Sequence, residues 1–239
     1  MVIFLKLLLA HILGDFLFQP RAWVGHKEKN KAASPYLYLH VVIHGTLILL
    51  FLWDWNLYYI ALIVAVSHLL IDLVKIYLQK PNTRIAWFIS DQLLHVAVLL
   101  GVYFWYTGDY FGVENIPYNY AFWLIVTAVI FLTSGVSIIM NVMLQRWSKF
   151  VFDASDDSLS NAGKYIGILE RVFVFVFILT DHWEAVGFLI TAKSVFRFGD
   201  LKESRDRKLT EYILIGTLLS FGFAIFTALL TNYLLALNT

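Results

Sequence analysis

The chain has 239 residues, of which 60% are hydrophobic, 17% aromatic and only 15% charged. Soluble domains carry roughly a quarter charged residues, so this composition and a mean hydropathy of +0.72 exclude an ordinary soluble protein and indicate an all-α polytopic integral membrane protein. Cysteine is absent, which excludes disulfides and thiolate metal sites, and a net charge of +1 gives no reason to expect a nucleic-acid partner.

Eight apolar segments are candidate membrane spans, because a spanning helix needs roughly 20 apolar residues. They cover residues 2–18, 37–53, 57–78, 85–106, 119–144, 165–180, 184–198 and 209–235. The first, sixth and seventh are short, and the seventh is either a span or a re-entrant segment. We expect one membrane domain over residues 1–239, with a histidine- and aspartate-rich four-helix part at 1–106 and a second four-helix part at 119–235.

Lysine and arginine are concentrated in alternate loops. Loops 18–36, 75–84, 145–164 and 197–208 hold four, three, three and five of these residues, fifteen of the 18 in the chain. The connections between them and the C-terminal tail hold none. Because cytoplasmic loops are rich in lysine and arginine, we expect these four loops in the cytoplasm and both termini outside it, in a bacterial inner membrane.

Four consecutive spans each carry two metal-binding side chains spaced four residues apart, which places both on one face of a helix. Ionisable residues inside a membrane are costly and usually functional. The pairs are His11 and Asp15, His40 and His44, His68 and Asp72, and Asp91 and His95. Since the spans alternate in direction, the eight side chains are expected to lie in two adjacent layers at the cytoplasmic side.

Metal binding accounts for this pattern. Imidazole and carboxylate together suit Zn, Mn or Fe, and pairs at this spacing on facing helices build metal sites in helical bundles. Eight donors predict either two ions or one ion with a surrounding set of orienting groups. Asp15, Asp72 and Asp91 are candidate catalytic bases. Gln19 and Gln92 lie beside the pairs and are candidate partners of the ligands, although an ordinary interhelical contact explains each equally well.

Cationic residues of the back half are expected at the same leaflet. They are Lys164, Arg171, Lys193 and Arg197, with Glu170 beside them. Such a group favours an anionic, phosphate-bearing substrate. The alternative is that Lys193 and Arg197 extend to lipid head groups, while Glu170 neutralises a basic neighbour.

The chain resembles a bacterial and phage membrane family catalogued as domain of unknown function 3307. The resemblance rests on residues 9–16, the pair His40 and His44, residues 68–72 and 91–95, and in the back half on residues 166–171, 192–198 and 211–218. The family implies no activity. The front half is also similar in style to inner-membrane proteins proposed as metal-dependent hydrolases, which carry H-x3-D pairs in their spans.

Three functions compete for the histidine and aspartate residues. The first is a membrane-embedded, metal-dependent hydrolase that acts on a lipid-linked or phosphate-containing substrate at the cytoplasmic leaflet. The second is a transporter of divalent metal or protons, and the third is a membrane protein with a structural metal site. The outer halves of the first four spans hold almost no ionisable residue apart from Lys6, which disfavours a transport pathway and favours the enzyme.

The charge pattern makes the topology testable. Reporter fusions at Asn30 and Ser160 should give a cytoplasmic signal, and a fusion at Gly112 should give an external one. A cytoplasmic signal at Gly112, or an external one at Asn30, would contradict the eight-span arrangement.

Overall fold

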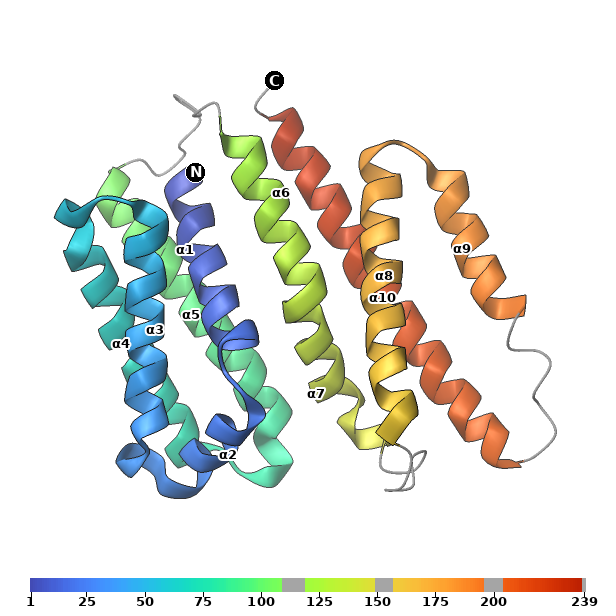
Figure 1. Cartoon of the computed structure of the whole chain (residues 1–239), viewed down its shortest axis with the longest axis horizontal. Coiled ribbons are helices and arrows are strands. Elements are labelled where there is room, and N and C mark those ends of the chain that lie inside the picture. The colour runs from blue at the N-terminus through green and yellow to red at the C-terminus, as the bar shows by residue number, and fades with distance from the viewer. Residues whose placement is uncertain (109–118, 149–156, 196–203, 238–239) are drawn as a thin grey trace. The chain divides into compact units, whose positions relative to one another are not determined.

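The computed structural model describes residues 1–108, 119–148, 157–195 and 204–237, and every regular element within them is helical. Figure 1 shows the helices in chain order. They are α1 (Val2–Ile12), α2 (Arg21–Asn30), α3 (Pro35–Leu52), α4 (Tyr58–Leu78), α5 (Arg84–Thr107), α6 (Tyr120–Ile130), α7 (Val136–Ser148), α8 (Asp157–Leu179), α9 (Trp183–Val195) and α10 (Ser204–Ala236). The short turns are η1 (Leu13–Leu17), η2 (Lys31–Ala33), η3 (Trp55–Leu57), η4 (Pro81–Thr83) and η5 (Phe131–Gly135).

The protein is an all-α polytopic membrane protein. Five described stretches are long and apolar enough to cross a membrane, namely Pro35–Leu52, Trp55–Leu78, Pro81–Thr107, Tyr120–Gln145 and Thr210–Ala236. A sixth candidate is the bent pair formed by Val2–Leu17 and Arg21–Ala33, whose axes differ by 84°. These six correspond to six of the eight expected spans.

The other two expected spans are helical but fall short of the same standard. The described part of helix α9 has 13 residues, fewer than a membrane crossing needs. Helix α8 carries Lys164, Glu170 and Arg171 along its apolar stretch. The count of eight and the placement of the termini therefore remain predictions.

The chain forms two compact units, Met1–Thr127 and Ala128–Thr239. The division falls inside α6, beyond the polar segment 107–118, most of which lies outside the described residues. In the N-terminal unit, α1 contacts α3 and α5, and α4 also contacts α3 and α5, so these four helices close into a bundle (Figure 1).

The segment 18–36, expected to be a loop, contains helix α2. Pro20 has the extended conformation of a residue that precedes a helix, and Lys31, with φ of 53°, ends α2. Helix α2 contacts α3, and the η2 turn contacts α4. A polar helix therefore packs against the end of the bundle at which α4 connects to α5.

The apolar core of the N-terminal unit occupies the opposite half of the bundle. On every helix, its residues lie on the side of the histidine and aspartate pair that is farther from α2. They are Leu7, Ala10, Ile48, Leu52, Ile60, Ala61, Val64, Leu99 and Val102. The polar side chains of the bundle are thus confined to one half of it.

The C-terminal unit has its own core, in which α10 packs against α7, α8 and η5, and α9 packs against α8. Its most buried members include Leu132, Val136, Val174, Ile178 and Ala224. Arg171 of α8 extends into this core and is only 4% exposed. Its guanidinium donates hydrogen bonds to Leu132 O at 2.7 Å, Ser137 Oγ at 2.7 Å and Ser220 Oγ at 3.0 Å.

Candidate metal centre

All eight side chains of the four pairs meet inside the N-terminal bundle. Seven of them are at most 5% exposed, and Asp15 is half-buried as a residue. Their donor atoms form three overlapping groups in which all atoms lie within 4.8 Å of one another. These groups are His11, Asp15, His44 and His68; His40, His68 and Asp72; and Asp15, Asp91 and His95.

Asp15 is the common partner of the three other helices. Its Oδ1 accepts from the Nε2 atoms of His40 and His44, each at 3.1 Å. The Nε2 of His68 lies 3.5 Å from the same oxygen. Oδ2 accepts from Gln92 Nε2 at 2.7 Å. One carboxylate therefore connects the first span to α3, α4 and α5.

A wider helical turn carries Asp15. In the η1 turn, Phe18 N donates to Leu13 O at 2.9 Å, a bond across five residues that marks a π-helical turn. Single π-helical turns of this kind occur frequently at functional sites. Gly14 lies in the same turn, where an added Cβ would be 2.4 Å from His44 Nε2. Only a residue without a side chain lets the two helices approach this closely.

The donor spacing fits a metal ion. Four donors placed about 2.0–2.1 Å from a tetrahedral ion lie about 3.3 Å from one another. Here the distances from Asp15 Oδ1 to His40, His44 and His68 run from 3.1 to 3.5 Å, and the Nε2 atoms of His40 and His68 are 3.0 Å apart. These are also hydrogen-bond lengths, and His40 belongs to a different donor group from Asp15 and His44, so the spacing is compatible with metal ligands but does not define one common position for an ion.

Unsatisfied atoms lead to the same interpretation. The Nδ1 atoms of His40, His44 and His68, both ring nitrogens of His95 and the Oδ1 of Asp91 are buried without a hydrogen-bond partner within the described residues. Buried polar atoms without partners are rare in proteins, and each calls for an explanation such as an ion or water. Asp91 Oδ1 and the two His95 nitrogens are available to an ion or water, whereas the three Nδ1 atoms point away from the Nε2 atoms that face Asp15 and call for water instead.

Two lysines compensate the outer carboxylates. Lys27 of α2 donates to Asp72 Oδ2 at 2.7 Å, and both residues are buried. Lys75 of α4 donates to Asp91 Oδ2 at 2.6 Å. Each lysine bonds the Oδ2 of its carboxylate and so fixes the orientation of the aspartate. The Oδ1 of the same aspartate is not used by the lysine.

The two glutamines named from the sequence both lie beside the cluster. Gln92 contacts three residues of the cluster. Its Oε1 lies 3.3 Å from His11 Nε2, and its Nε2 donates hydrogen bonds to Asp15 and Asp91. Gln19 lines a cavity of about 30 Å³ that also reaches Lys27 and Asp72. This small cavity lies between α2 and α4, beside the cluster.

The back-half cations lie in the C-terminal unit, and their substrate-binding role remains a prediction. Lys193 donates to Glu170 Oε2 at 2.5 Å, and Arg171 is occupied by its three interior hydrogen bonds. Lys164 is exposed, and Arg197 lies outside the described residues. Glu170, Arg171 and Lys193 thus make hydrogen bonds and an ion pair within the C-terminal unit.

Sequence reasoning missed Gly14, Lys27 and Lys75 as parts of the site. Both lysines fall in loops that the charge pattern predicts to be cytoplasmic, because a lysine near a span boundary usually marks that side. Lys75 lies three residues after Asp72, a spacing that could have linked it to the pair. No local signal connects Lys27 with Asp72, since the two are 45 residues apart.

This fold and cluster define an all-α membrane protein with a buried histidine and aspartate centre. Residues 3–120 match the family described as "Protein of unknown function (DUF3307)", which supports a domain of unknown function over this region. The match covers nearly all of the N-terminal unit and ends before the back-half segments on which the resemblance also rested. No curated protein and no solved structure matches the chain.

Gly14→Ala should destabilise the protein, because its methyl group would overlap the His44 ring. Overpacking of this kind typically costs about 1–3 kcal/mol. Thermal unfolding in detergent measures the effect, with Gly101→Ala as the control, since nothing lies within 4 Å of an added Cβ there. Equal midpoints for the two variants would contradict the close approach of η1 and α3.

The pair of Lys27 and Asp72 should behave as a buried ion pair. Lys27→Met leaves a buried carboxylate unpaired, which typically costs about 3–5 kcal/mol, whereas the double variant with Asp72→Leu should recover most of that loss. The measurement is unfolding of the metal-free protein in a chelator. Lys29→Met, on the exposed face of the same helix, is the control. A double variant no more stable than Lys27→Met would argue against the pair.

Proposed function

We propose that the N-terminal unit is a metal-dependent hydrolase that binds one or two divalent transition-metal ions, Zn, Mn or Fe, and acts on a lipid-linked or phosphate-containing substrate. The observation that carries this proposal is the set His11, Asp15, His44 and His68, whose donor atoms lie within 4.8 Å of one another. Mixed imidazole and carboxylate donors are the ligands that such ions use. This set shares Asp15 with one of the other two donor groups and His68 with the other. Neighbouring groups that share ligands suit two adjacent ions.

A bound ion would supply Lewis-acid polarisation of a phosphoryl group and activation of water. The protein's own residues would do the rest. Asp91 keeps one buried oxygen, Oδ1, without a hydrogen-bond partner among the described residues, while Lys75 holds its other oxygen. Asp91 is therefore the best placed of the three carboxylates to accept a proton.

The proposed reaction is hydrolysis of a phosphate ester. The oxygen of water forms a bond to phosphorus, and a proton of that water passes to Asp91 Oδ1. The bond between phosphorus and the ester oxygen breaks, and that oxygen takes the proton from Asp91 and leaves as an alcohol. Asp15 and Asp72 take part as candidate ligands, because the donor atoms of each lie within 4.8 Å of those of two or more of the histidines.

The apolar core favours this enzyme over a transporter. A pathway across the membrane would have to continue beyond the cluster, between residues that are packed and almost fully buried. Leu7, Ile48, Ile60 and Leu99 are each at most 1% exposed and belong to that core. A centre that is closed on this side suits chemistry or binding at one leaflet.

Purified protein should carry about one or two transition-metal ions per chain, and His68→Ala should lower that content, because His68 belongs to two of the three donor groups. Elemental analysis after removal of loosely bound metal makes the measurement. His182→Ala is the matched control, since His182 is exposed between α8 and α9. If the wild-type protein neither retains nor rebinds metal, the hydrolase proposal loses its basis.

A further inference from the structure

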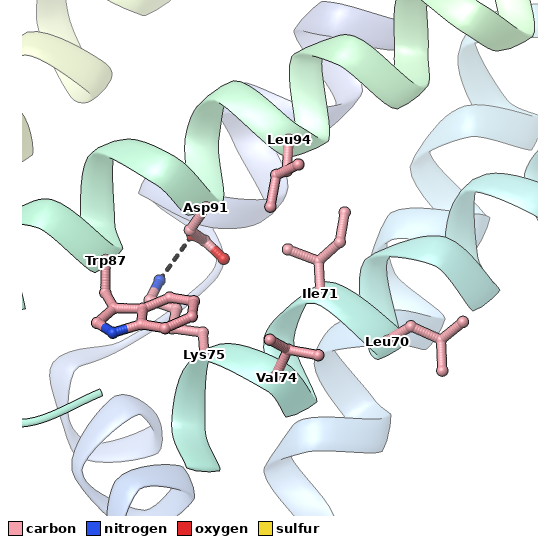
Figure 2. Close-up of a pocket in the computed structure, with 7 residues that line it drawn as sticks. All are labelled: Leu70, Ile71, Val74, Lys75, Trp87, Asp91 and Leu94. Carbon is pink, nitrogen blue, oxygen red and sulfur yellow. Dashed lines mark hydrogen bonds and ion pairs between the residues drawn. The ribbon is translucent and has the colours of Figure 1, made fainter. Parts of the chain in front are cut away.

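A groove between α4 and α5 leads from the outside of the bundle to the candidate centre. It has a volume of about 160 Å³ and is drawn in Figure 2. An apolar cavity of roughly 150 Å³ is large enough to hold a benzene-sized group. The walls are formed by Leu70, Ile71, Val74, Trp87 and Leu94, and the two polar residues that line it are Lys75 and Asp91.

The groove opens toward lipid. Leu70, Val74 and Leu94 are about half exposed, at 57%, 48% and 49%, on helices that are long and apolar enough to cross a membrane. Water has little reason to fill a groove with such walls, whereas a hydrocarbon chain of the bilayer has the matching chemistry. The mouth of the groove therefore admits the chain of a lipid.

The polarity of the groove changes along its length. Lys75 and Trp87 lie within one turn of the helix ends Leu78 and Arg84, where tryptophan and lysine are typical of the membrane interface. Leu70 and Leu94 each lie more than two turns from these ends. This gradient follows that of an amphiphile, with its head group at the interface and its chain in the hydrocarbon.

The polar end of the groove touches the centre. Lys75 and Asp91 close this end of the groove: the Lys75 side chain is 23% exposed, and its ammonium group donates to Asp91 Oδ2 at 2.6 Å (Figure 2). Asp91 also belongs to the donor group with Asp15 and His95. A phosphate held by Lys75 would therefore lie one side chain away from the candidate metal ligands.

We infer that this groove is the substrate-binding site for a lipid with a phosphate head group, whose chain lies along Leu70, Val74 and Leu94 and whose phosphate contacts Lys75. This inference rests on the proposed hydrolase and specifies its substrate as a membrane lipid that enters laterally. Lysine ammonium groups bind phosphate through charge-assisted hydrogen bonds. A free phosphate compound from the cytoplasm would have no use for the apolar walls.

The test uses the full-length protein in phosphatidylcholine nanodiscs, with a minor fraction of either phosphatidate or phosphatidylcholine carrying brominated chains. Bromine quenches tryptophan fluorescence at short range, and Trp87→Phe identifies the share of the signal that comes from Trp87. At equal bromine content, phosphatidate should quench Trp87 more strongly than phosphatidylcholine. Lys75→Gln should weaken phosphatidate binding about tenfold, and Lys75→Arg should retain it.

A pair of matched variants tests the groove itself. Val74→Phe fills the groove, whereas Val66→Phe adds the same side chain two turns earlier on α4, at an equal exposure of 48% and outside the groove. Val74→Phe should abolish the preference for phosphatidate and Val66→Phe should preserve it. Equal quenching by the two lipids, or equal behaviour of the two variants, would overturn the lipid site.

Metal content measured on the same samples separates this inference from the proposed function. A protein that retains metal but shows no preference for phosphatidate would contradict the lipid site and leave the metal centre intact. A protein that prefers phosphatidate but binds no metal would support the groove and contradict the hydrolase. Inorganic phosphate added in excess should fail to displace phosphatidate, since it lacks the chain, and displacement would point to a soluble substrate.

Discussion

The packing of the N-terminal unit depends on the hydrogen bonds that the buried Asp15 carboxylate accepts from the neighbouring helices. A charged group among membrane helices is costly unless other groups compensate it. Asp15 receives this compensation from His40, His44 and Gln92, which come from two other helices, with His68 of a third close by. The same contacts that make the carboxylate tolerable also determine how the four helices face one another.

The carboxylates of Asp72 and Asp91 are also costly to bury, and lysines compensate them instead of histidines. Asp72 and Asp91 lie nearer the α2 end and are each paired with a lysine. Removing one partner of a buried ion pair is strongly destabilising, so these lysines hold α2 and the α4–α5 end in place. Helix α2 and the η2 turn make further hydrogen bonds at this end: Lys31 Nζ of η2 donates to Ile76 O, and Glu28 of α2 accepts from Gln79 and Arg84. A polar helix thereby covers the end of the centre.

In the described part of the C-terminal unit, buried charge is compensated by hydrogen bonds and an ion pair. The Arg171 guanidinium is satisfied by one backbone carbonyl and two serine hydroxyls, and Glu170 is paired with Lys193. Arg171 contacts the π-helical turn η5, where Leu132 O accepts from Nε. These hydrogen bonds fix how α7, α8 and α10 pack. The sequence alone does not show whether Arg171 has this structural role or binds a substrate.

Composition and spacing by themselves determined the class of protein and the faces that carry its polar residues. Long apolar stretches must be helical in a membrane, because their backbone groups have no other hydrogen-bond partners, and a spacing of four residues places each pair on one helix face. Ionisable side chains avoid lipid, so the four faces were expected to meet, and the eight side chains do lie together.

Only the tertiary structure decided which groups complete the cluster. Lys27 reaches Asp72 because the chain turns by 84° after the first span and returns as α2, and no local pattern encodes that return. Gly14 acquires its importance from the His44 ring, 30 residues later in the chain, and Arg171 from acceptors on three separate elements. Sequence spacing orders residues within one helix, whereas these contacts join helices, and their geometry exists only once the bundle has packed.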